Sequence, residues 1–353
     1  MPTRYDVDRV AMRELLADQP RYRVDQLWDG LYRQAAPLES LTTLPKALRA
    51  RLHEELPEAL DEVTESVSDD GATIKWLWSL DGGAAIETVL MHYRDRSTVC
   101  VSTQAGCAMA CGFCATGQAG FERNLSVGEI VEQVVRAIRR AQEGPTPRRV
   151  SNVVFMGMGE PMANFDRMWG AVERLHTDIG LSARHITIST VGIIPGIRRL
   201  AEQALPVNLA VSLHAANDTL RNELVPINRR YPLDDLAAAL SSYLGVKNRR
   251  LSFEWAMIDG VNDRPVDAQQ LASYARGLRA HINLIPLNPT PGYSTRGTPA
   301  DGVRAFRDHL EALGANATVR QNRGTEIDAA CGQLRAAHEI AVAAPTRAAR
   351  PRG

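Results

Sequence analysis

Several features of membrane and secreted proteins are missing from this chain. No uncharged apolar run approaches the roughly 18 residues that a membrane-spanning helix needs. The first residues, Met1–Asp6, lack the apolar core of a secretory signal peptide. The 41 basic and 41 acidic side chains cancel to a formal net charge of 0, so bulk charge neither predicts nor excludes a nucleic-acid partner. We therefore expect a cytoplasmic protein without a membrane partner.

Cysteine is also scarce, and its placement excludes a disulfide-stabilised secreted fold. The chain has 5 cysteines in 353 residues, which is an odd number. Three of them lie within the short stretch from Cys107 to Cys114, too close together to form a framework of disulfides. This usage is typical of a reducing compartment, where thiols remain available as metal ligands.

The hydrophobic pattern predicts an α/β chain in several parts. Residues 1–62 show the spacing of three short amphipathic helices, and we expect an accessory RNA-binding domain there. Residues 63–97 alternate in a way that predicts a β-hairpin linker. Residues 98–340 alternate short apolar runs with helical patterns, and residues 341–353 form an alanine-rich basic tail that we expect to be flexible.

The short apolar runs of the third part are typical of strands buried on both faces. We expect six of them, at 98–102, 150–156, 186–190, 207–213, 251–258 and 282–287. About six β-then-α units are too few to close an eight-fold barrel. The sequence therefore predicts a partial β/α barrel, whose open side would admit a large substrate.

The loop after the first of these strands contains the spacing C-x3-C-x2-C, made by Cys107, Cys111 and Cys114. Thiolates are ligands for iron–sulfur clusters, zinc and Cu(I). Three cysteines on a four-iron cluster leave one iron without a protein ligand, whereas a structural zinc site is closed by four ligands. A three-cysteine zinc site completed by a histidine remains an alternative at this point.

Polar residues and glycines follow the next strands at the same predicted end. Parallel barrels build their sites from the loops after their strands. Each of these residues alone would be an ordinary turn or strand end, and their shared placement predicts ligand contacts. The residues concerned are Gly159 and Glu160 in the run Gly157–Pro161, Ser189, Ser212, Leu213, His214 and Asn288.

These motifs together resemble one family, the radical S-adenosylmethionine (SAM) RNA methyltransferases of the RlmN and Cfr type. The resemblance covers residues 5 to 337. It rests on the cysteine loop with the following run of residues 120–125, on residues 157–161, 212–214 and 288–289, and on the segment 330–334 around Cys331. The run Gly-Phe-x-Arg-Asn-Leu is more similar to RlmN than to Cfr.

The resemblance implies a [4Fe-4S] cluster on Cys107, Cys111 and Cys114, with SAM on the open iron and against Gly159, Glu160, Ser189, Ser212, Leu213, His214 and Asn288. It also implies that Cys331 takes a methyl group from one SAM, and that a second SAM is cleaved to a radical that removes a hydrogen from this S-methyl group. The carbon radical would then add to adenine. Cys100 would resolve the adduct and end in a disulfide with Cys331, and Glu87 would accept a proton.

The implied activity is methylation of carbon 2 of adenosine, at position 2503 of 23S rRNA and at position 37 of tRNA. The expected partners are these RNAs and a reducing electron donor such as a flavodoxin system, and we expect a monomer. A Cfr-like methylation of carbon 8 and, less favoured, a glycyl-radical activating enzyme are the alternatives within radical-SAM chemistry. A zinc-stabilised RNA-binding module without catalysis is the alternative outside it.

Overall fold

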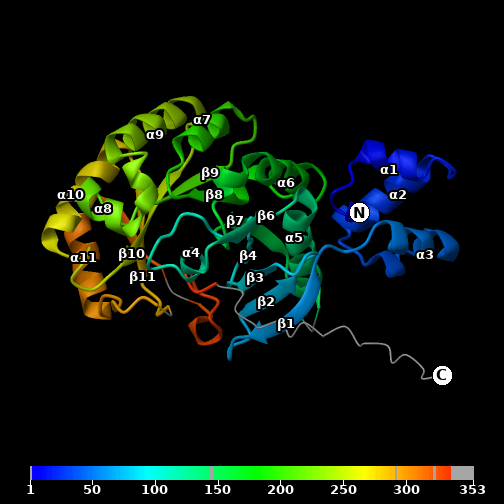
Figure 1. Ribbon diagram of the computed structural model, residues 1–353, viewed down its shortest axis with the longest axis horizontal. Coiled ribbons are helices and arrows are strands. Elements are labelled where there is room, and N and C mark those ends of the chain that lie inside the picture. The colour runs from blue at the N-terminus through cyan, green and yellow to red at the C-terminus, as the bar shows by residue number, and fades with distance from the viewer. Residues whose placement is uncertain (1, 144–145, 291, 321–322, 335–353) are drawn as a thin grey trace, which may run out of the picture.

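The computed structural model describes residues 2–143, 146–290, 292–320 and 323–334 (Figure 1). The predicted tail, residues 341–353, and the last residues of the predicted barrel, 335–340, lie outside the described residues. Within the described part, ten strands form one sheet in the order β1-β2-β3-β4-β7-β8-β9-β10-β11-β12. The strands from β4 onward are parallel, and β1 to β4 are antiparallel.

All six strands predicted from the apolar runs are present, and the predicted α/β partial barrel is confirmed. They are β4 (Ser97–Cys100), β7 (Val150–Phe155), β8 (Ile186–Thr190), β9 (Asn208–Ser212), β10 (Leu251–Met257) and β11 (His281–Pro286). A seventh parallel strand, β12 (Asn316–Val319), extends the sheet beyond β11. The pattern did not predict β12, because it is four residues long and two of them are exposed.

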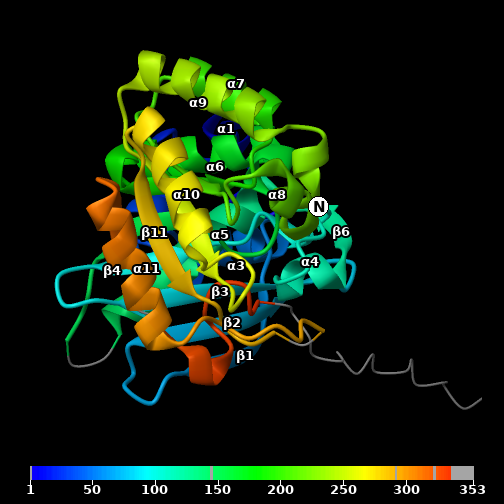
Figure 2. The same ribbon diagram turned by 90° about the vertical axis from the view of Figure 1, so that its left-hand side faces the viewer.

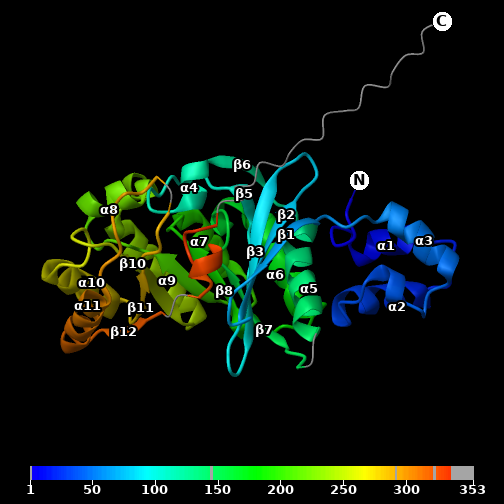
Figure 3. The same cartoon turned by 90° about the horizontal axis from the view of Figure 1, so that it is seen from below.

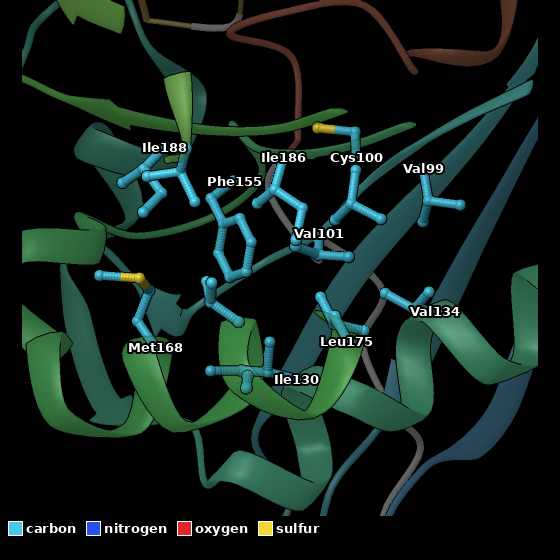
Figure 4. Close-up of a cluster of buried hydrophobic side chains, with 14 of the residues drawn as sticks. Val99, Cys100, Val101, Ile130, Val134, Phe155, Met168, Leu175, Ile186 and Ile188 are labelled. Atoms are coloured by element: carbon cyan, nitrogen blue, oxygen red, sulfur yellow. The ribbon is translucent and has the colours of Figure 1, made fainter. Parts of the chain in front are cut away.

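Helices cover the outer face of the curved sheet (Figure 2). They are α5 (Val127–Gln142), α6 (Phe165–Thr177), α7 (Ile194–Glu202), α9 (Leu233–Lys247), α10 (Pro265–Gly277) and α11 (Ala300–Ala312). The short helix α8 (Asp218–Leu224) lies at the end of the barrel that carries the cysteine loop, and its Leu224 belongs to one apolar cluster with Cys111 and Phe113. Helix α5 begins directly after Ser126, which forms a capping box with Glu129 at the first turn. Its apolar side packs on the sheet: Figure 4 shows Ile130 and Val134 of α5 on the same side of the strands as Leu175 of α6.

The N-terminal residues form α1 (Arg9–Leu15), α2 (Tyr22–Trp28), a π-helical turn η1 (Asp29–Arg33) and α3 (Lys46–Glu55). These elements lie beyond α5, at one end of the molecule (Figure 3). Charged groups connect them to the barrel: Glu58 accepts hydrogen bonds from Arg136 of α5 at 2.6 Å and from Arg4 at 3.0 Å. Short 3-10 turns occur at η2 (Leu38–Ser40), η3 (Pro161–Asn164), η4 (Ala183–His185), η5 (Pro226–Arg229) and η6 (Thr325–Ile327).

The predicted hairpin is larger than expected. It consists of β2 (Thr73–Ser79) and β3 (Ala85–His92), and a further strand, β1 (Asp61–Val67), pairs with β2. Strand β1 was missed because its sequence is acidic and its side chains are largely exposed, so it shows no apolar alternation. We call β1, β2 and β3 the sheet extension; β3 pairs directly with the first barrel strand, β4. The domain limits 1–62, 63–97 and 98–340 stay predictions.

The register of the sheet extension decides which residues share a face. Val89 of β3 lies opposite Lys75 of β2 and opposite Cys100 of β4. Directly opposed residues point to the same side of a sheet. The Cys100 sulfur points away from Val134 of α5 in Figure 4, so Lys75 and Cys100 lie on the face that α5 does not cover. Among the described residues, no helix is long and apolar enough to cross a membrane.

Candidate active site

A small two-stranded sheet frames the three-cysteine loop. Strands β5 (Gln104–Gly106) and β6 (Phe121–Asn124) pair on either side of it, and α4 (Ala115–Ala119) follows Cys114. The amide of Cys107 donates to the Gly120 carbonyl at 2.6 Å, which closes the loop. Gly106 has φ +71°, and a Cβ there would lie 2.0 Å from that same carbonyl oxygen, so the loop requires glycine.

The three thiols lie on one wall of a large cavity, which has a volume of about 1010 Å³ including open solvent. Cys111 is buried, and burial raises the pKa of Cys107 to about 12. Within the described ranges no three Cys, His, Asp or Glu side chains are placed to share one metal ion. A four-iron cluster has a different requirement, one thiolate on each of three irons, and three thiols from one short loop fit that donor set.

Almost all predicted SAM contacts line the same cavity. They are Gly159, Glu160, Ser189, Ser212, His214 and Asn288. Leu213 is the exception, because its side chain is fully buried in the hydrophobic core. The cavity lies where parallel barrels place their sites, beyond the carboxyl ends of β7, β8, β9 and β11. The structure thus brings these residues together, and their contact with SAM stays a prediction.

Glu160 connects two strand ends. Its carboxylate accepts hydrogen bonds from the amides of Met162 at 2.9 Å and Val191 at 2.8 Å. Its own amide donates to the Gln104 side chain at 2.8 Å. Burial raises the pKa of Glu160 to about 7, and the two amide hydrogen bonds oppose this rise. The neighbouring Gly159 has φ +99°, and a Cβ there would lie 2.5 Å from the Gln104 Cβ.

His214 is held as a neutral ring. Its Nδ1 accepts a hydrogen bond from the Ala256 amide at 2.9 Å, so the neutral ring carries its proton on Nε2. Burial, with the nearby Arg221 guanidinium, lowers the pKa of His214 to about 3. Its ring also meets Phe113 of the cysteine loop edge-on, with centroids 4.7 Å apart. His214 is therefore a hydrogen-bond donor on the cavity wall across the neutral pH range.

Arg221 was not predicted from the sequence. Its buried guanidinium donates to the carbonyls of Leu213 at 3.1 Å and Val191 at 2.7 Å, and to the Asn228 side chain at 2.7 Å. These bonds fix the chain just after β8 and β9, beneath the cavity. Burial lowers the pKa of Arg221 to about 10, which leaves it a cation at neutral pH.

The segment that carries Cys331 is attached to the cysteine loop. The Ala115 amide, next to Cys114, donates to the Gly332 carbonyl at 2.8 Å, and the Thr116 hydroxyl donates to the Leu334 carbonyl at 2.5 Å. From the other side, the Asn288 side-chain amide donates to the Cys331 carbonyl at 3.0 Å. Cys331 lines the large cavity together with the three loop cysteines.

Cys331 also lines a second, smaller cavity, which it shares with Cys100. The Cys100 thiol is buried, and burial, with a smaller contribution from Cys331, raises its pKa to about 12. Arg320 lines both cavities, and the charge of Cys331 raises the pKa of this guanidinium above its ordinary value. Cys331 therefore stands between the three-cysteine loop and a second thiol. Both Cys100 and Cys331 are free thiols in this structure.

Glu87 lies outside both cavities. It is buried on β3, where its carboxylate pairs with the Lys75 ammonium at 2.8 Å, and its carbonyl accepts a hydrogen bond from the Ser102 hydroxyl at 2.6 Å. Ser102 follows β4 and leads into the cysteine loop. Glu87 is thus near the mouth of the barrel.

Comparison with known proteins decides the family. The model of the Radical SAM superfamily matches residues 101–272. A probable dual-specificity RNA methyltransferase RlmN of Chloroflexus aurantiacus is 50% identical over 351 residues, covering 95% of this chain and 93% of that protein. This chain belongs to the RlmN family of radical SAM enzymes. Dual-specificity RNA methyltransferase RlmN 1 of Myxococcus xanthus is 49% identical over 344 residues, covering 95% of this chain and 94% of that protein.

The fold agrees with the sequence comparison. The crystal structure of a radical SAM methyltransferase from Sphaerobacter thermophilus has a TM-score of 0.91 and 50% sequence identity, covering 95% of this chain and 100% of that chain. Membership of the RlmN family confirms the recognised resemblance and the expected [4Fe-4S] cluster and SAM. It also removes the zinc-stabilised module, the alternative that lay outside radical-SAM chemistry.

Sequence reasoning missed the charged residues around the RlmN-type site. Arg221 and Lys75 stand in runs that have no motif-like spacing, and each has a partner on a distant segment, Val191 for Arg221 and Asp328 for Lys75. Arg320 also belongs to no recognised motif, and the structure places it on the walls of both cavities. A buried charge is visible only once the fold is known.

Proposed function

We propose that this chain methylates carbon 2 of adenosine in 23S rRNA, at position 2503, and in tRNA, at position 37, with Cys331 as the carrier of the methyl carbon. The observation that supports this best is the position of Cys331, on the wall of the cavity that holds the three-cysteine loop and also on the wall of the cavity that holds Cys100. A carrier has to meet both the methyl donor and the thiol that releases it. The names of the relatives support the RNA substrate.

In this proposal each group has one role. Cys107, Cys111 and Cys114 hold the cluster, and the cavity residues from Gly159 to Asn288 hold SAM. Bound there, the cluster and SAM supply an electron and a radical that removes hydrogen from a carbon. Cys331 carries the methyl carbon, Cys100 takes over the Cys331 sulfur as a disulfide when the product leaves, and Glu87 accepts a proton.

Such a route suits the chemistry of the target. Carbon 2 of adenine is an electrophilic carbon between two ring nitrogens, so it does not attack the methyl group of SAM as an amine would. A carbon radical on a protein sulfur avoids this polarity. A glycyl-radical activating enzyme needs neither Cys331 nor Cys100, and a Cfr-like enzyme places the methyl group on carbon 8.

Nucleoside mass spectrometry of RNA incubated with the cluster-loaded protein, SAM and a reductant tests the proposal. We expect 2-methyladenosine in 23S rRNA fragments and in tRNA. Formation of 8-methyladenosine would assign the Cfr-like activity instead, and absence of both products under reducing conditions would contradict RNA methylation. Control reactions omit the reductant.

The setting of the reaction is part of the same proposal. We propose that the protein works as a monomer in the cytoplasm, where free thiols and iron–sulfur clusters persist. A low-potential donor such as a flavodoxin system would deliver the electron. Analytical ultracentrifugation of the cluster-loaded protein tests the monomer.

The raised pKa of Glu160 predicts a pH dependence of SAM binding. The Glu160 carboxyl, with a pKa of about 7, is mostly protonated at pH 6 and mostly ionised at pH 8. The amino group of SAM would donate to the ionised form, so binding favours loss of this proton and tightens as the pH rises. From pH 6 to pH 8 we expect the affinity to rise roughly ten-fold more in the wild type than in Glu160→Gln.

Anaerobic equilibrium titration of SAM into both cluster-loaded proteins measures this difference. The Glu160→Gln variant is the matched control, because it keeps the size of the side chain and cannot ionise. Equal pH slopes in the two proteins would show that Glu160 does not meet SAM.

A further inference from the structure

Lys75 joins two parts of the site that are far apart along the chain. Its ammonium is 2.8 Å from Oε1 of Glu87, and the two side chains are 13% and 6% exposed. The same ammonium donates to the Asp328 carbonyl at 3.3 Å, across 253 residues of sequence. Asp328 precedes Cys331 by three residues. One largely shielded cation therefore contacts both the proposed proton acceptor and the segment of the proposed methyl carrier.

The register of the sheet extension explains how this contact arises. Lys75, Val89 and Cys100 are opposed on β2, β3 and β4, so they share the face that α5 leaves uncovered. The segment 323–334 packs on this face. Arg323 donates to the His92 carbonyl at 3.2 Å, and a Cβ on Gly324 would lie 2.8 Å from Thr73 Cγ2. Figure 2 shows η6, the helical turn of this segment, beside the strands of the sheet extension.

The contact with Asp328 falls on a strained residue. Asp328 has φ +52°, in the left-handed region that few non-glycine residues adopt. The Lys75 ammonium donates to its carbonyl, and the Gln333 side-chain amide is 3.4 Å from its carboxylate. The turn of the chain before Cys331 is thus held from both sides.

We propose that Lys75 is a positioning residue of the methyl-transfer reaction: through its two contacts it holds the Glu87 carboxylate in register with the Cys331 segment. This inference rests on the proposed function, in which Glu87 accepts a proton. The ion pair is short and largely shielded from water, and removing one partner of such a pair is costly. Without the ammonium, the contact that joins the Glu87 carboxylate to the Asp328 carbonyl is lost.

The choice of lysine allows a graded test. Lysine is rare in this chain, which has only three (Lys46, Lys75 and Lys247) among 41 basic residues. Its ammonium is a compact point charge, whereas arginine has a wide planar fork. Lys75→Arg keeps the charge and alters its shape, and Lys75→Met keeps the length and removes the charge.

The experiment compares these two variants with the wild type as cluster-loaded proteins. Three quantities are measured: RNA methylation turnover, S-methylation of Cys331 by peptide mass spectrometry, and the fraction of protein linked covalently to RNA on a denaturing gel. For Lys75→Met we expect turnover to fall about a hundred-fold, the size of a lost acid–base contribution. S-methylation of Cys331 should remain within about two-fold of the wild type while the covalent adduct accumulates, because proton acceptance comes after methyl loading.

Lys75→Arg should recover most of the turnover. The matched control is Arg140→Met, which removes the ion pair of Arg140 with Glu65 at 3.1 Å on the opposite face of the same sheet extension. This control should keep wild-type turnover.

The outcomes separate the two proposals. If the wild type forms no 2-methyladenosine, the proposed function fails. If the wild type is active and Lys75→Met turns over equally fast, the role of Lys75 is overturned. A parallel loss of Cys331 S-methylation, turnover and melting temperature in Lys75→Met would also overturn it, because that pattern shows a structural role alone.

Discussion

Replacement of Cys331 by alanine is expected to abolish RNA methylation, with a loss of at least about a thousand-fold, the order found when a covalent nucleophile is removed. The thiol is the proposed attachment point of the methyl carbon, and no neighbouring thiol can substitute for it in the cofactor cavity. Cys107, Cys111 and Cys114 on the same wall are committed to the cluster. The measurement is the yield of 2-methyladenosine per chain.

The same variant should keep its iron and its affinity for SAM. The backbone carbonyls of Gly332 and Leu334 accept hydrogen bonds from Ala115 and Thr116 beside the cysteine loop, and the Cys331 carbonyl accepts one from Asn288. The substitution leaves all three carbonyls in place. Residual methylation by Cys331→Ala within ten-fold of the wild type would contradict a carrier role. Such a result would fit an enzyme that transfers the methyl group from SAM to RNA without a cysteine carrier.

Cys100→Ala is also expected to reduce turnover strongly. It differs from Cys331→Ala in the species that accumulates. The smaller cavity is lined by Cys100 and Cys331 and by none of the three cluster cysteines. Without Cys100 the bond between Cys331 and the base has no thiol to break it. We expect product formation to fall at least about a hundred-fold and a covalent protein–RNA species to accumulate.

A denaturing gel with labelled RNA measures this species, and nuclease digestion followed by peptide mass spectrometry locates it. The adduct should map to the peptide that contains Cys331. The double variant Cys100→Ala with Cys331→Ala is the control, and it should form no adduct. Free turnover of Cys100→Ala without an adduct would exclude Cys100 from product release.

The sequence predicted most of the barrel because its strands are buried on both faces. Runs such as 150–156 and 186–190 are rich in β-branched residues and carry no charge for that reason, and they lie where expected in β7 and β8. Strands β1 and β12 were missed because they lie at the two edges of the sheet, where exposed side chains erase the pattern. Membership of the RlmN family then confirmed the recognised cofactors.

The candidate site was predictable to the extent that local motifs carry it. The cysteine loop and the strand-end residues Glu160, Ser189 and His214 stand at positions that a parallel barrel brings together, and they line one cavity. The charged residues that support them were not predictable. Lys75 meets Asp328 across 253 residues, and no local spacing indicates a contact of that kind. Leu213 shows the opposite case, because it lies within a motif and its side chain belongs to the core.

Isotope labelling of the methyl donor tests the central claim most directly. The protein is supplied with SAM whose methyl group carries three deuterium atoms, and the mass of the product nucleoside is measured over many turnovers. Transfer through a carbon radical on Cys331 removes one deuterium and replaces it with hydrogen from solvent, so 2-methyladenosine should retain two. Retention of all three would show that the methyl group moves intact, and the account of Cys331 as a radical carrier would be wrong.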